Sequence, residues 1–188
     1  MSLTAVLPAG AIENWHIWLV SAVLVIAAVI DGWKLKVPNW LTFPFVMAGW
    51  AYSALWFGWA GLGWSLMGTG VGLLLLLPAY AIGGMGAGDV KLLAGVGAWM
   101  WGTVTFYAFC VSAVVGGLLA VAMVLYSRKI GHHKAQFFSI LTEIMVLRNP
   151  EELSKIAAER KSSMMLLPYG IPIAIGTIAY FAWAGMLV

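Results

Sequence analysis

Two aspartates of this sequence, Asp31 and Asp89, stand directly beside long apolar stretches. A carboxylate at membrane depth is energetically costly, and such residues usually serve a function. If the two lie close together in a partly dry site, they cannot both ionise easily and instead share a proton. The carboxylate of such a pair can take a proton from water while the carboxylic acid polarises a peptide carbonyl. The pair therefore indicates acid–base activation of water.

Each aspartate also has a structural explanation. Asp31 could end an apolar helix and pair with Lys34. Asp89 could cap the helix that follows it, because its carboxylate would face the free N–H groups of the first turn. The sequence at these two positions fits both the structural and the chemical interpretation.

A glycine-rich segment precedes the second aspartate, with four glycines at 83, 84, 86 and 88. Glycine permits positive φ angles and the close approach of another backbone. An extended peptide could lie against such a loop and bring its carbonyl to Asp89. A cation-binding loop is the competing interpretation, but it would need more oxygen-bearing side chains than this segment offers.

The composition is that of a membrane protein. The chain has 188 residues, of which 63% are hydrophobic and 9% are charged, whereas soluble domains are about half apolar and about a quarter charged. A core of this size cannot bury that much apolar surface, which excludes a soluble enzyme, a disordered chain and a nucleic-acid binder. The single cysteine, Cys110, excludes an internal disulfide and a cysteine-based metal site. We predict no metal and no cofactor.

Six apolar stretches are long enough, or nearly so, to cross a bilayer as helices, which takes about 20 residues each. They cover residues 15–30, 41–57, 64–82, 89–101, 104–126 and 166–187. No basic residue precedes Lys34, so the first stretch is predicted to be a retained span and not a signal peptide. The predicted fold is an all-α integral membrane protein of six transmembrane helices, forming a single domain over 1–188.

The charges give the predicted fold an orientation. With six spans, one side of the membrane holds the loops at 31–40, 83–90 and 127–165, and all ten Lys and Arg residues fall on that side. The positive-inside rule makes this side cytoplasmic and places both termini outside. The segment 127–165 has apolar residues at helical spacing, typical of an amphipathic helix on the membrane surface. It is either a surface connector or a segment that docks or covers a substrate.

Three motifs together resemble those of the prepilin peptidases, also called type IV leader peptidases, which are GxGD-type membrane aspartic peptidases. The segment DGWKLKVPN at 31–39 resembles their first active-site motif, and GAGDVK at 86–91 resembles their second. LPYGIP at 167–172 resembles the segment that opens their last span. The similarity covers about 15–187, and the combination is far more specific than GxGD alone.

The resemblance implies an aspartic endopeptidase of the cell inner membrane, with its active site at the cytoplasmic face. Such enzymes remove the short basic leader of prepilin-like precursors next to the start of a hydrophobic helix. Asp31 and Asp89 would be the catalytic pair. The residues that would shape or line the substrate site are Gly86, Gly88, Lys91, Pro168, Tyr169 and Gly170.

The chain also departs from the larger family members. It lacks their insertion with paired CxxC motifs, so we predict leader cleavage without N-methylation. Its length resembles the short branch that serves tight-adherence (Flp-type) pili, with an archaeal relative as the near alternative. A different class of function, a small proton- or cation-coupled transporter, would use the same buried acids. No internal repeat of the kind common in transporters stands out in the sequence.

Overall fold

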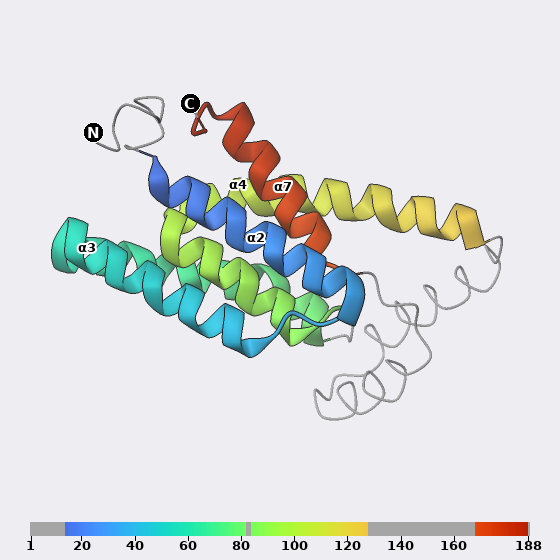
Figure 1. Cartoon of the computed structure of the whole chain (residues 1–188), viewed down its shortest axis with the longest axis horizontal. Helices are drawn as coiled ribbons and strands as arrows, with labels where there is room; N and C mark the ends of the chain where they lie inside the picture. Colours follow the sequence, from blue (N-terminus) through green and yellow to red (C-terminus); the bar gives the residue numbers. More distant parts are fainter. Residues whose placement is uncertain (1–13, 82–83, 128–167, 188) are drawn as a thin grey trace, which may run out of the picture.

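The computed structural model describes residues 14–81, 84–127 and 168–187. These residues form four helices and no strand: α2 (Trp15–Lys34), α3 (Asn39–Ala81), α4 (Ala87–Ser127) and α7 (Gly170–Trp183) (Figure 1). Three of them, up to Met123 in α4, are long and apolar enough to cross a membrane, and α7 is a shorter apolar helix. The predicted all-α membrane fold is confirmed at this level. The polar segment at 128–165 and the N-terminal tail lie outside the described residues.

Helix α3 folds back on itself at Gly58, whose φ of 64° and ψ of −156° are non-helical. Trp50 Nε1 donates a hydrogen bond to Thr69 Oγ1 at 2.9 Å, across 19 residues of sequence. A straight helix would separate these residues by about 28 Å, at 1.5 Å per residue, so the chain reverses between them. We predicted a loop at 58–63, but residues 59–81 are helical and one glycine with positive φ makes the turn.

Helix α4 reverses at Trp101, which has a φ of 62° and a ψ of −176°. Positive φ is strained for a bulky side chain, and contacts from α3 hold the residue in place. The Trp101 indole stacks edge-on against Phe57 at 5.3 Å between ring centroids. One turn earlier, the Ala98 carbonyl accepts hydrogen bonds from the hydroxyls of Ser65 at 2.5 Å and Ser53 at 3.5 Å. The break that the sequence predicts at 101–103 thus falls at Trp101.

The second half of α4 packs antiparallel to α7. The Tyr107 and Tyr180 rings stack at 5.8 Å, the Ser112 hydroxyl reaches the Ile173 carbonyl at 3.5 Å, and Gly116 faces the Tyr169 ring. In these three contacts the residue numbers of α4 rise while those of α7 fall, so the two helices run antiparallel. Beyond this contact the last turns of α4 extend past the other helices (Figure 1).

Glycines form the seam between α3 and α4. A Cβ added to Gly68 would meet the Gly97 carbonyl oxygen and would lie 2.7 Å from Trp101 Cα. A Cβ on Gly72 would lie 2.6 Å from the Leu93 carbonyl oxygen. Small residues let helix backbones approach closely, which is a common way of packing helices in membranes. This seam fixes the first half of α4, and with it the start of that helix.

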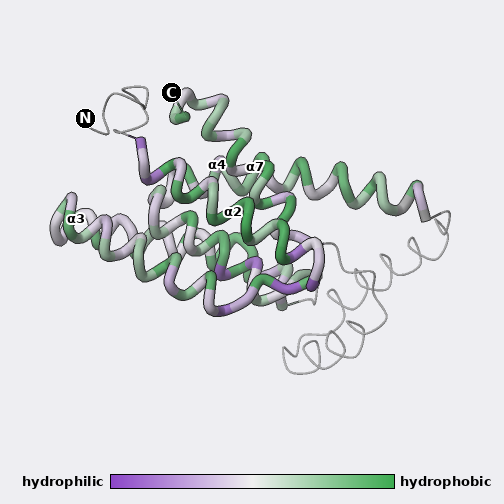
Figure 2. Tube along the Cα trace, viewed as in Figure 1, coloured by the Kyte–Doolittle hydropathy of each residue, from purple (hydrophilic) through white to green (hydrophobic). Residues whose placement is uncertain are grey.

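Two further boundaries differ from the prediction. Helix α2 continues past the predicted end at residue 30 to Lys34, where Leu35 adopts a left-handed conformation (φ 50°) and its N–H binds the Asp31 carbonyl oxygen at 2.8 Å. Asp31 therefore lies in the last turn of a helix and not after it. Helix α7 ends at Trp183, four residues before the predicted end at 187. Figure 2 shows that polar residues gather where α2 ends and α3 begins.

The glycine seam makes a stability prediction with a matched control. Gly68→Ala forces a Cβ onto the backbone of α4, and overpacking of this kind costs about 1–3 kcal/mol. Gly70→Ala, two residues along the same helix, has nothing within 4 Å of the added carbon. We expect Gly68→Ala to lower the apparent unfolding temperature in detergent and Gly70→Ala to leave it unchanged or slightly raised. Equal midpoints for the two variants would contradict the described seam.

Candidate active site

A cavity of about 380 Å³ lies where α2 ends and where α3 and α4 begin. Both aspartates singled out in the sequence line this cavity, together with Gly86, Gly88 and Lys91. The remaining lining residues come from the α2–α3 connector, the start of α3 and the glycine segment, and they are Leu35, Lys36, Val37, Asn39 and Ala87. The structure thus brings together two acids that are 58 positions apart in the sequence.

Asp31 is buried, with 2% of its surface exposed, and its carboxylate is bound by the start of the last helix. The Gly170 N–H donates a hydrogen bond to Asp31 Oδ2 at 2.8 Å. This N–H belongs to the first turn of α7, where backbone donors have no partner within the helix. A Cβ on Gly170 would lie 2.9 Å from the same oxygen, so only glycine lets the helix start approach this closely.

Asp89 is also buried, at 5% exposed, and lies in the first turn of α4. Its Oδ2 accepts a hydrogen bond from the Gly86 N–H at 3.0 Å, which is the acidic half of a capping box. The capping role considered for Asp89 is therefore present in the structure. It involves one carboxylate oxygen and is compatible with Asp89 facing the cavity.

Gly88 joins the two halves of the site. A Cβ at this position would lie 2.6 Å from the Val37 carbonyl oxygen and 2.9 Å from Val37 Cβ. The connector after Asp31 therefore rests directly on the backbone just before Asp89. This contact gives the glycine segment a clear physical role, because a larger residue at 88 would push the two aspartate-bearing elements apart.

Tyr169 lies beside the second aspartate, immediately before α7. Its ring packs on Gly116 of α4, where an added Cβ would lie 3.0 Å from the ring. Burial, and in second place the negative charge of Asp89, raise the pKa of the Tyr169 hydroxyl above its ordinary value. The phenol is therefore protonated at neutral pH. Pro168 contributes its carbonyl to the turn that begins α7, accepting from Ile171 N–H at 3.2 Å.

Lys91 extends across to α3. Its Nζ donates to Asn39 Oδ1 at 2.9 Å and lies 4.6 Å from the centre of the Phe43 ring. The first amides of α3, those of Leu41 and Thr42, bind the Pro38 carbonyl, which leaves the Asn39 side chain for Lys91. Asn39 ends the first of the three motifs, but its contact with Lys91 and that of Phe43 were not predicted, since no local signal pairs residues about 50 positions apart.

No group of three or more His, Cys, Asp or Glu side chains that could hold a metal ion occurs within the described parts of the chain. The cavity is lined by two carboxylates and by the ammonium groups of Lys36 and Lys91, and the protonated phenol of Tyr169 lies near Asp89. Such a set suits proton transfer to and from a polar substrate held between the carboxylates.

Comparison with known families gives a match to the type IV leader peptidase family over residues 18–121, which is more than half of the chain. The chain belongs to this family. The matched region contains both aspartates and the glycine segment, and it ends before the segment at 168–170. The resemblance drawn from the three motifs is thereby confirmed at the level of the family.

Individual family members are similar at modest identity. The prepilin leader peptidase/N-methyltransferase of Aeromonas hydrophila is 31% identical over 125 residues, which is 63% of this chain and 42% of that protein. The protein of the same name from Bacillus subtilis (strain 168) is 35% identical over 112 residues, covering 57% of this chain and 44% of the relative. This chain thus spans less than half the length of these relatives. No solved structure matches it.

The environment of Tyr169 predicts how its hydroxyl titrates. The difference in tyrosinate absorbance between the unaltered protein and Tyr169→Phe reports this one group among the six tyrosines. We expect it to ionise at higher pH than an exposed tyrosine. Because the charge of Asp89 contributes to the shift, Asp89→Asn is expected to move the titration back toward lower pH. A titration unaffected by Asp89→Asn would contradict the described proximity.

Proposed function

We propose that this family member is an aspartic endopeptidase that removes the basic leader of prepilin-like precursors at the cytoplasmic membrane face. The observation that carries the proposal is the placement of Asp31 and Asp89 on one cavity, each with a backbone N–H bound to a carboxylate oxygen. The family match and the printed names of the relatives support the substrate class.

In the proposed reaction the two aspartates share one proton. The ionised carboxylate removes a proton from water, and the resulting hydroxide attacks the scissile carbonyl carbon. The protonated partner donates its proton to the carbonyl oxygen, giving a tetrahedral diol. The diol then collapses and the C–N bond breaks, as the first aspartate returns its proton to the leaving amine and the second takes a proton from one diol hydroxyl. This leaves a carboxylic acid product and restores the shared proton. Water is consumed, and no oxidant or cofactor is required.

The proposal places six helical segments across the membrane. The reversals at Gly58 and Trp101 divide α3 and α4 into two segments each, which with α2 and α7 makes six among the described residues. The cavity lies at the end of the bundle that carries Lys34, Lys36 and Lys91. The positive-inside rule assigns this end to the cytoplasm.

The transporter alternative uses the same acids, but nothing in the family match favours it. Both acids lie together at one end of the bundle, whereas transporter binding sites typically lie near the middle of the membrane. The peptidase is therefore the function the site supports best.

Replacement of either aspartate tests the proposal. Asp31→Asn and Asp89→Asn keep the size of the side chain and remove its acid–base chemistry, so each is expected to reduce cleavage of a prepilin by about 10²- to 10⁴-fold. The measurement is mass spectrometry of the products made by purified protein in detergent. A single cut at the leader–helix junction is expected, and the product mass also tests the prediction that the new N-terminus is not methylated.

The control is Cys110→Ser, which changes an exposed residue on the second half of α4. It is expected to cleave like the unaltered protein, and all variants are checked for a monodisperse peak on size exclusion. Substantial cleavage by a folded Asp31→Asn or Asp89→Asn variant would refute the aspartate pair. Ion flux in proteoliposomes that disappears in Asp89→Asn, without any cleavage, would revive the transporter.

A further inference from the structure

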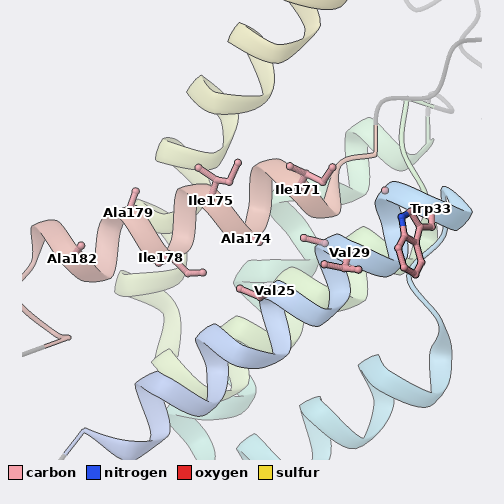
Figure 3. A pocket seen from close by; sticks show the side chains of 11 residues that line it. Val25, Val29, Trp33, Ile171, Ala174, Ile175, Ile178, Ala179 and Ala182 are labelled. Atoms are coloured by element: carbon pink, nitrogen blue, oxygen red, sulfur yellow. The ribbon is translucent and has the colours of Figure 1, made fainter. Parts of the chain in front are cut away.

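An apolar groove of about 830 Å³ runs along the surface between α2 and α7 (Figure 3). Its lining consists entirely of apolar residues from these two helices, and none of them is charged. Three lining residues with branched side chains are about half exposed, Val25 and Val29 at 50% and Ile175 at 48%. Exposed apolar surface of this extent on a membrane protein faces lipid or a partner helix.

The groove ends at the candidate active site. Gly32, which lines it, is the neighbour of Asp31, and Ile171, which also lines it, is the neighbour of the Gly170 that binds Asp31. The groove and the cavity with both aspartates thus meet at the same end of α2 and α7. A second apolar hollow, of about 600 Å³, is lined in part by Trp101 and lies at the opposite end of α4's first half. It cannot lead a substrate to the aspartates.

The dimensions of the groove suit a helix. Its α7 lining runs from Ile171 to Ala182, which is about 16 Å or three helical turns at 1.5 Å per residue. Small residues lie along the groove on both helices, among them Ala28, Gly32 and Ala179. Small residues let a second helix backbone approach closely in a membrane.

We propose that this groove holds the first turns of the hydrophobic helix of the precursor, in line with the two aspartates. The inference rests on the proposed function, because it takes the precursor as substrate. A helix lying in the groove with its N-terminal end at Gly32 and Ile171 runs parallel to α7 and away from the cavity. The chain that precedes it, which holds the leader, then continues past Asp31 into the cavity. The groove thus selects substrates whose cleavage site adjoins an apolar helix.

The test uses two substrates and groove-filling variants. One substrate is a full prepilin, and the other is a short peptide that spans the cleavage site and stops before the hydrophobic helix. Ala28→Phe and Ala179→Phe fill the groove from α2 and from α7 without touching either aspartate. The matched control is Ala22→Phe, an exposed α2 position that does not line the groove.

We expect both groove variants to reduce kcat/KM for the full prepilin by about 10- to 100-fold, the scale of steric discrimination in an apolar pocket. Cleavage of the short peptide is expected to be unchanged, and Ala22→Phe is expected to behave like the unaltered protein on both substrates. Full activity of the groove variants on the prepilin, in a protein that cleaves it, would overturn the groove assignment and leave the peptidase standing.

A binding measurement separates the two proposals further. A photoreactive amino acid at Val29 or Ile175 is expected to cross-link the full prepilin, and the same group at Ala22 is not. This readout does not require cleavage, so a cross-link from a protein that cuts neither substrate supports the groove and refutes the peptidase. Cross-links from Val29 and Ile175 to lipid alone would assign the groove to an acyl chain and overturn the inference.

Discussion

The hydrogen bond from the Gly170 N–H to Asp31 Oδ2 connects the first and last described helices across 139 positions of sequence. A carboxylate that is 2% exposed must find a donor, because burying an unpaired polar group costs several kcal/mol. The start of a helix supplies such donors, since its first N–H groups have no partner within the helix. The start of α7 is therefore held on the end of α2 by the acid it binds, and only glycine at 170 allows the approach. The groove between α2 and α7 follows from the same contact.

The second acid is positioned by backbone contacts of the same kind. Gly86 donates to Asp89, Gly88 lies against the Val37 carbonyl, and the glycine seam around Gly68 fixes α4 on α3. At Gly88 and Gly68 a missing side chain lets two backbones meet, and at Gly86 a backbone N–H meets the Asp89 carboxylate. The site is thus built largely from close approaches of main-chain atoms, which place the two aspartates on one cavity.

The sequence predicted the parts of this arrangement that leave a local signal. Acids at the edges of apolar stretches, glycines before Asp89 and the distribution of Lys and Arg all pointed to one polar end of a helical bundle. Contacts between distant positions left no such signal, so the Lys91–Asn39 pair and the packing of Tyr169 on Gly116 were not predicted. The turns were only partly predicted, because Gly58 reverses α3 in one residue and Trp101 adopts a positive φ that its residue type disfavours.

The most direct test of the account asks whether Asp31 and Asp89 face one cavity. In a Cys110→Ser background, the double variant Asp31→Cys/Asp89→Cys is treated with an oxidant and with a short thiol cross-linker. The account predicts rapid intramolecular cross-linking in the folded protein, and none for Asp31→Cys/Thr103→Cys, whose second cysteine lies just beyond the reversal of α4. Absence of a cross-link between positions 31 and 89, in a protein that is folded and has both thiols reactive, would contradict it.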